Sequence, residues 1–104
     1  DMGCGNGLSS VAFLDGNYTL IGIDISRGMV KRAVERIKDS PFRAHAHFFV
    51  ADAENLPFKR GTFDACVGFG ILHHVNDVAQ TLRSLSYALK IGGYYFGHEN
   101  NKTF

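Results

Sequence analysis

Three glycines occupy alternate positions near the start of the chain, at Gly3, Gly5 and Gly7, and a segment with helical character follows them. Glycine lets the backbone pass close to a ligand, and the first amide groups of a helix favour polar or anionic ligand atoms. The third glycine comes one residue too early for the dinucleotide-binding pattern Gly-x-Gly-x-x-Gly, because position 8 is Leu. The loop predicts a site for a nucleotide-like ligand or, alternatively, only a tight turn from strand to helix.

An acidic residue, Asp24, ends the next apolar run, about 20 residues beyond the glycines, where nucleotide-binding folds place their ribose-binding acid. A carboxylate at this position accepts hydrogen bonds from both ribose hydroxyls, and its charge disfavours a 2′-phosphate. A strand-ending Asp that contacts only water is the alternative. The combination with the glycine loop favours the ribose role.

Strands and helices that alternate along the chain must position these residues. The apolar pattern predicts strands at residues 18–25, 46–51, 63–69 and 94–97. It predicts helices at residues 8–14, from Ser26 toward Pro41, and from Asn76 or Asp77 through Leu89 to the glycines at 92 and 93. Residues 53–62 are expected to form a loop with one short turn.

This alternation predicts an α/β fold with a Rossmann-like, mostly parallel sheet flanked by helices. Open α/β sheets bind ligands at the carboxyl ends of their strands. In the predicted pattern Asp24, Asp52, residues 69–74 and residues 98–100 follow strand ends. We therefore expect the ligand site to be built from these positions.

The composition narrows the class of protein. The chain has 104 residues, a length typical of one domain, and its net charge of +1 comes from acidic and basic residues that are interspersed. This balance predicts no nucleic-acid partner and no membrane partner. The two cysteines, Cys4 and Cys66, lie far apart and have no histidine at ligand spacing, which predicts no metal site, no disulfide and a cytoplasmic location.

The motifs resemble those of class I S-adenosylmethionine-dependent methyltransferases, and the group known as methyltransferase type 11 is the most similar. Residues 1–7 (DMGCGNG) resemble the first motif, and residues 22–26 (GIDIS) resemble the second-strand motif. Residues 51–58 (ADAENLPF) are similar to the adenine-binding segment, and Phe63 and Asp64 then open the fourth strand. LHHV at 72–75 and LKIGG at 89–93 complete five motifs in family order across the chain.

The resemblance implies S-adenosylmethionine as the cofactor and methyl transfer to a small-molecule acceptor as the reaction. It implies that the three glycines pass under the methionine part of the cofactor. Asp1 would orient that part, directly or through water, and Asp24 would bind the ribose. The resemblance leaves carbon, oxygen and nitrogen acceptors open.

The resemblance also implies contacts for the adenine and the sulfonium. Ile25 would pack on the adenine ring, Asp52 would accept from its amino group, and the Ala53 amide would donate to the ring. Phe69 and Gly70 would lie near the methionine amino group and the reacting sulfonium. Loop capping is the alternative role for Asp52.

A base is needed only if the acceptor must lose a proton. His73 and His74 are the titratable pair near the expected methyl position, and histidine suits proton transfer near neutral pH. Adjacent side chains do not easily both point inward, and a packing or helix-start role is the alternative for each. His98, Glu99 and Asn100 either contact the acceptor or cap the end of the last strand.

Relative to the family, we expect residues 1–104 to form a partial cofactor-binding domain. The family order of strands is three-two-one-four-five, and here the first strand is nearly absent and the C-terminal strands are missing. Two internal strand edges would then lack partners, so we expect this piece alone to fold poorly and to turn over weakly.

Two other functions compete with methyl transfer. The chain is alternatively a degenerate cofactor-binding scaffold without catalysis, although the retained glycines, Asp24 and Asp52 argue for cofactor binding. An NAD-dependent oxidoreductase shares the fold and the ribose-binding acid. The early third glycine and residues 51–58 count against it.

Overall fold

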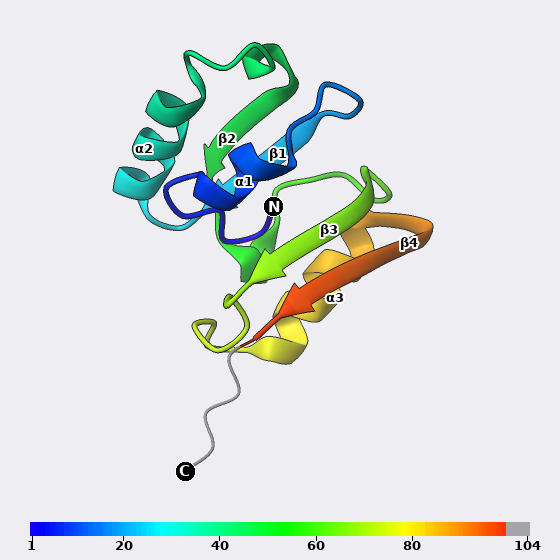
Figure 1. The fold of residues 1–104 in the computed structure, drawn as a ribbon. Helices are drawn as coiled ribbons and strands as arrows, with labels where there is room; N and C mark the ends of the chain where they lie inside the picture. Colours follow the sequence, from blue (N-terminus) through cyan, green and yellow to red (C-terminus); the bar gives the residue numbers. More distant parts are fainter. Residues whose placement is uncertain (100–104) are drawn as a thin grey trace. The chain divides into compact units, whose positions relative to one another are not determined.

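The protein was analysed as a computed structural model that describes residues 1–99 and divides into two compact units. The first unit consists of Asp1 and Gly3–Asp52, and the second consists of Met2 and the chain from Ala53 onward. Each unit contains a pair of parallel strands with helices packed against it (Figure 1). The predicted α/β class with parallel strands flanked by helices is therefore confirmed. No helix among residues 1–99 has the length and apolar character needed to cross a bilayer.

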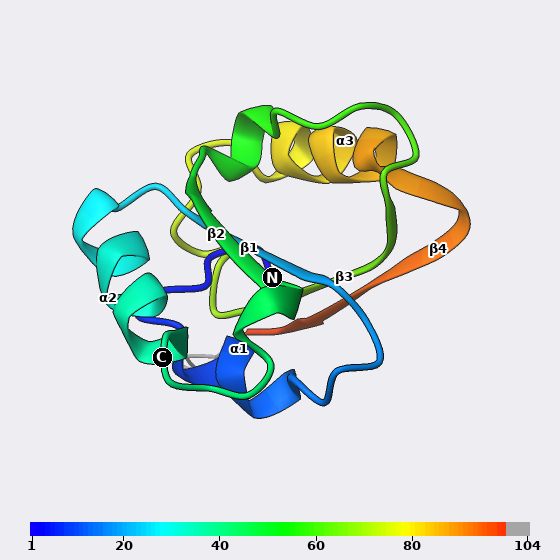
Figure 2. The same ribbon diagram turned by 90° about the horizontal axis from the view of Figure 1, so that it is seen from above.

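The first unit is built on two short parallel strands. Its elements are α1 (Leu8–Phe13), β1 (Leu20–Asp24), α2 (Arg27–Ile37), the 3₁₀ turn η1 (Arg43–His45) and β2 (Ala46–Val50). The pairing of β1 with β2 runs in register from Leu20 opposite Ala46 to Asp24 opposite Val50. Figure 2 shows α1 and α2 on the same side of this strand pair.

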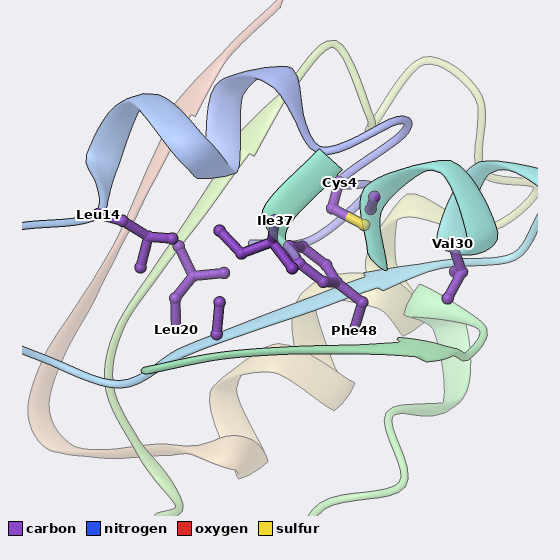
Figure 3. Close-up of a cluster of buried hydrophobic side chains, with 8 residues drawn as sticks. Cys4, Leu14, Leu20, Val30, Ile37 and Phe48 are labelled. Carbon is purple, nitrogen blue, oxygen red and sulfur yellow. The ribbon is translucent and has the colours of Figure 1, made fainter. Parts of the chain in front are cut away.

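One apolar cluster holds the first unit together (Figure 3). In α2, Val30, Ala33 and Ile37 recur at helical spacing and are buried, and Ala33 has no exposed surface. Burying an aliphatic side chain of this size stabilises a fold by about 1.5–3 kcal/mol, so the stripe fixes α2 on the strands. The complete cluster comprises Cys4, Leu14, Leu20, Val30, Ala33, Ile37, Ala46 and Phe48.

The edge of β1 that faces away from β2 is hydrogen-bonded to the first residues of the chain. The Asp1 nitrogen donates to the Ile21 carbonyl (2.6 Å), and the Ile23 N–H donates back to the Asp1 carbonyl (2.9 Å). The Cys4 N–H donates to the Ile23 carbonyl (2.8 Å). These bonds continue the parallel pattern along the carboxyl-terminal half of β1 and hold the glycine loop at its end.

The second unit repeats the same plan. Its elements are the 3₁₀ turn η2 (Ala53–Asn55), β3 (Phe63–Phe69), α3 (Val78–Ala88) and β4 (Leu89–His98). Figure 2 shows α3 on one side of the β3–β4 pair. At the other edge of β3, Met2 forms a single parallel bridge to Gly68, and its N–H donates to the Val67 carbonyl (2.8 Å). Among the described residues this bridge is the pairing that the predicted, nearly absent first strand makes with β3.

The boundary between the last helix and the last strand differs from the prediction. Leu89 was predicted as the final apolar residue of the helix, but α3 ends at Ala88 and Leu89 is extended (φ −81°, ψ 142°). Leu89 instead pairs with Phe63 at the start of β4. The register then jumps, so that Ala65 lies opposite Tyr94, and Gly92 takes φ +84° in the bulge between them. The predicted strand at 94–97 is the regular part of β4.

The helix starts agree with the predicted caps. The Ser26 side chain accepts from the Met29 N–H (3.3 Å) at the start of α2. Of the two candidates at the start of α3, Asp77 is the cap, and its side chain accepts from the Gln80 N–H (2.9 Å). Each cap satisfies an amide that the helix itself leaves without a partner.

Replacing Gly22 tests the packing between β1 and β2. A Cβ at this position would lie 2.5 Å from the ring of Phe48 and 3.2 Å from the Cβ of Cys4. We expect Gly22→Ala to lower the free energy of unfolding of the full-length protein by about 1–3 kcal/mol, the usual cost of overpacking a core. Urea denaturation measures this difference.

The matched control is Gly28→Ala in α2, where the nearest atom to the new Cβ is 3.8 Å away. Alanine favours a helix over glycine by up to about 1 kcal/mol, so this variant should be neutral or stabilised. Equal stability of the two variants would show that Phe48 does not pack as described.

Candidate functional site

The predicted glycine loop adopts a backbone conformation that favours glycine at each of its three positions. Gly3, Gly5 and Gly7 have φ angles of 73°, 54° and 81°, in the left-handed region that other residues rarely adopt. A Cβ on Gly7 would also lie 2.9 Å from the Cβ of Ala33 in α2. The loop therefore needs glycine for its path and, at position 7, for close packing between helices.

Asp24 ties this loop to the end of β1. One carboxylate oxygen accepts from the Gly5 N–H (2.9 Å), and the other accepts from the Ser26 N–H (2.8 Å). A carboxylate offers about four acceptor positions, so each oxygen keeps capacity for another bond. Asp24 thus shapes the loop, opens the turn into α2, and retains acceptor capacity for the hydroxyls of a ligand.

The Asp1 carboxylate is fixed from the other side of the loop. It accepts a hydrogen bond from the Ser10 hydroxyl of α1 (2.6 Å), and Ser10 has no exposed surface. The loop has a further contact in Arg36, whose Nε donates to the Asn6 carbonyl (3.0 Å). Sequence reasoning missed Ser10 and Arg36. A serine on the apolar side of a short helix was the only signal for the first, and nothing local signals the second.

Cys4 lies within the loop, but its thiol is not set up as a nucleophile. Burial and, second, the nearby Asp24 carboxylate raise the pKa of the Cys4 thiol from 9.0 to about 11. The thiol is therefore protonated near neutral pH, and only the thiolate is a good nucleophile. Cys4 is part of the apolar cluster of the first unit.

The two predicted adenine contacts of the first unit follow the ends of its paired strands. Ile25 comes directly after β1 and its side chain is exposed, at 72% of its full area. The Ala51 N–H donates to the Asp24 carbonyl (3.1 Å), so the chain that leaves β2 stays beside the end of β1. Asp52, the next residue, is exposed. An exposed apolar side chain and a carboxylate at adjacent strand ends suit a flat ring with a polar edge.

The second unit holds the remaining predicted site residues. Ala53 is buried in η2, which packs on α3. Phe69 ends β3, and the next residue, Gly70, has φ +65° and donates its N–H to the His98 carbonyl (2.7 Å). The roles assigned to these residues remain predictions, as do those of the loop, Asp1, Asp24, Ile25 and Asp52.

The structure distinguishes between the two adjacent histidines. His73 Nδ1 lies 2.7 Å from a carboxylate oxygen of Glu99, and the other oxygen accepts from the Leu72 N–H (2.8 Å). The hydrogen bond from His73 is the main cause that lowers the pKa of Glu99 below its ordinary value. The ring of His74 lies against that of His73, with centroids 4.0 Å apart, and the backbone N–H of His74 donates to the Ile71 carbonyl (2.9 Å). Asn100 lies outside the described residues.

Comparison with known proteins places this geometry in a family context. The family described as "Methyltransferase domain" matches residues 1–97. The demethylmenaquinone methyltransferase of Symbiobacterium thermophilum is 31% identical to this chain. The alignment covers 100% of this chain and 43% of that protein. A tRNA (carboxymethyluridine(34)-5-O)-methyltransferase of Xenopus tropicalis is 30% identical, and the alignment covers 88% of this chain and 13% of that protein.

Solved structures show the same fold. A putative S-adenosyl-L-methionine-dependent methyltransferase from Methanococcus maripaludis matches with a TM-score of 0.84 and 27% identity, over 93% of this chain and 46% of that one. The [4+2]-cyclase SpnF matches with a TM-score of 0.83 and 25% identity, over 86% of this chain and 34% of that one. The chain thus spans less than half the length of each of these four proteins.

The lowered pKa of Glu99 predicts a pH-dependent stability. A carboxyl group whose pKa is depressed on folding stabilises the fold above its ordinary value of 4.5, and this stabilisation is lost as the pH falls through the lowered folded value. The full-length protein should therefore be more stable than Glu99→Gln at pH 7. The gap should be at most about 1 kcal/mol, because the side chains of both Glu99 and His73 are partly exposed to water.

Urea denaturation at a series of pH values measures this gap, which should close in acid. The matched control is Glu35→Gln, which removes an exposed carboxylate paired with Lys38. A gap for Glu99→Gln that stays constant from pH 7 to acid would contradict the described bonds to His73 and Leu72.

Proposed function

We propose that this chain, which belongs to the methyltransferase domain family, binds S-adenosylmethionine and directs its methyl group to a small-molecule acceptor. The observation that carries the proposal is the Gly5–Asp24 hydrogen bond (2.9 Å), because it joins the glycine loop to an acid with spare acceptor capacity. A nucleoside with an attached amino acid needs both features at the same strand end.

The residues present fit this cofactor. The three glycines leave the loop without side chains, so the methionine part can approach the backbone. The two oxygens of Asp24 each keep an acceptor position for one ribose hydroxyl. Ile25 offers an exposed apolar surface for the adenine ring, and Asp52 and the Ala53 amide offer an acceptor and a donor for its edge.

The work of these residues is to bind and to orient. S-adenosylmethionine supplies an activated methyl group on a sulfonium, and transfer to an acceptor is an in-line displacement. Holding the two reactants in line can lower the activation free energy by roughly 7–11 kcal/mol. The Ser10 bond to Asp1 and the Arg36 bond to Asn6 serve this orientation, since both restrict the glycine loop.

A small molecule is the acceptor that the features of the chain favour. The Symbiobacterium relative is named for a quinone, whereas the Xenopus relative is named for a tRNA, so the family includes both kinds of acceptor. A nucleic-acid acceptor needs a basic surface, and here a net charge of +1 comes from interspersed charges. A cytoplasmic location remains a prediction.

A second candidate function is a cofactor-binding domain without methyl transfer. The observation that favours it is the structural match to the [4+2]-cyclase SpnF. In that case the loop and Asp24 bind the cofactor, but no methyl group leaves it. An NAD-dependent oxidoreductase is a third candidate, and a binding measurement separates it from the first two.

Calorimetric titration of the full-length protein with S-adenosylmethionine tests the proposal. We expect binding that weakens about 10- to 100-fold in Asp24→Ala, because hydrogen bonds to a charged group contribute about 1.5–3 kcal/mol. Asp15→Ala is the matched control, since the exposed Asp15 carboxylate accepts a local bond from the Asn17 N–H (2.9 Å) outside the glycine loop. NAD should give no heat.

The outcomes separate the candidates. A folded protein that does not respond to S-adenosylmethionine would overturn the proposal, and binding of NAD in its place would favour the oxidoreductase. Tight binding without release of S-adenosylhomocysteine in the presence of a panel of small acceptors would favour the scaffold.

A further inference from the structure

The basic residues of the first unit are concentrated in one short stretch of its sequence. All six lysines and arginines of residues 1–52 lie between Arg27 and Arg43, together with only two of the six acids, Glu35 and Asp39. The remaining acids are Asp1, Asp15, Asp24 and Asp52. The near-zero net charge of the whole chain therefore hides a local excess of positive charge on α2 and the residues that follow it.

This excess lies on the exposed surface of α2. The helix packs its buried residues against the apolar cluster of the first unit, so its other side faces away from the strands (Figure 2). Exposed residues recur there at i, i+4, i+7 and i+11, a spacing that places them in one line along a helix. This basic stripe consists of Arg27, Lys31, Val34 and Lys38.

The cations of the stripe are available to a partner. Among the described residues, Arg27 and Lys31 form no ion pair, and neither does the exposed Arg32 beside them. Lys38 pairs with Glu35, and the two side chains are 57% and 69% exposed. Exposed pairs of this kind contribute little to stability, so Lys38 can exchange Glu35 for another carboxylate.

The placement of these charges works against the helix itself. Arg27 is the first residue of α2, where the helix dipole favours acidic residues, and the first turn contains no acid. Arg27 and Lys31 are also like charges four residues apart, which destabilises a helix. Residues that break a local rule of stability without a compensating contact point to a role outside the fold.

We propose that the basic stripe of α2 is a docking surface for an acidic segment of a partner protein. The charge of the stripe calls for carboxylates on the partner. Val34, at the middle of the stripe and 50% exposed, calls for an apolar residue among them. This inference is independent of the proposed function, because no residue of the stripe is assigned to the cofactor.

Other anionic partners fit this surface less well. A helix that binds a bilayer inserts its apolar face into the lipid, whereas the apolar face of α2 is buried in the protein. A nucleic acid is a long polyanion, and α2 with its 11 residues spans only about 16 Å. Outside residues 27–43 the first unit carries four acids and no lysine or arginine, which would repel the rest of a long polyanion.

Fluorescence anisotropy with the full-length protein and a labelled peptide tests the surface. The probe is a peptide of about 20 residues that repeats Glu-Glu-Leu-Glu, which gives carboxylates with an apolar residue on each helical turn. We expect binding that weakens as salt is added, because exposed charges are screened. The double variant Arg27→Glu/Lys31→Glu should raise the Kd by about 10- to 100-fold, since two attractive contacts become repulsive.

Two further variants separate the stripe from net charge and from unfolding. Lys59→Glu/Arg83→Glu makes the same change in net charge at exposed residues outside α2, and it should bind the peptide like the unsubstituted protein. Arg27→Gln/Lys31→Gln removes the charges without reversing them and should give a smaller loss. Urea denaturation of each variant distinguishes lost binding from lost folding.

The apolar part of the surface has its own test. Val34→Ser should weaken binding of the leucine-containing peptide and leave binding of poly-glutamate unchanged, because only the first probe has a side chain to pack on Val34. Equal effects on the two probes would remove Val34 from the surface.

Each outcome decides for or against the docking surface. A folded protein that does not bind the peptide at low salt would overturn the proposal, and so would an equal loss in the two charge-reversed double variants. Tighter binding of single-stranded RNA or of phosphatidylserine vesicles, lost in Arg27→Glu/Lys31→Glu, would replace the acidic segment by a nucleic acid or a membrane. Calorimetry with S-adenosylmethionine is a separate measurement, so failure of the proposed function and failure of this inference are distinguishable.

Discussion

The hydrogen bonds of one carboxylate shape the first unit. Asp24 accepts the Gly5 N–H with one oxygen and the Ser26 N–H with the other, so it fixes the glycine loop and the turn into α2 at once. Both bonds are charge-assisted and therefore stronger than bonds between neutral groups. The conformation of the loop and the proposed recognition of a ribose consequently depend on the same side chain, whose two oxygens are already oriented by these bonds.

The fold was predictable wherever a local signal agreed with the tertiary structure. The cap at Ser26 and the strand at residues 63–69 follow directly from residue type and spacing, and the second cap was narrowed to Asn76 or Asp77, of which the structure has Asp77. The end of the last helix was not predictable, because Leu89 continues the helical spacing of apolar residues. In the structure, its pairing with Phe63 overrides that spacing, since the same leucine is also suited to a strand.

The candidate site was predictable in its backbone and less so in its side chains. Alternating glycines indicated a loop that a ligand can approach closely or a tight turn, and in the structure all three have positive φ angles. The difference between His73 and His74 depends on Glu99, 26 residues along the chain from His73. The Arg36 bond to Asn6 likewise joins residues 30 positions apart. Such contacts exist only once the strands and helices have packed, so no local pattern of residues announces them.

The contact between Gly7 and Ala33 has a consequence for how this site can be modified. Ala33 is fully buried in α2, and a Cβ at position 7 would be only 2.9 Å from its own. Since the small size of both residues sets the distance between the loop and α2, a larger residue at position 33 must push the loop outward. Position 33 is thus a means of tuning cofactor affinity from the core, without altering any group proposed to contact the cofactor.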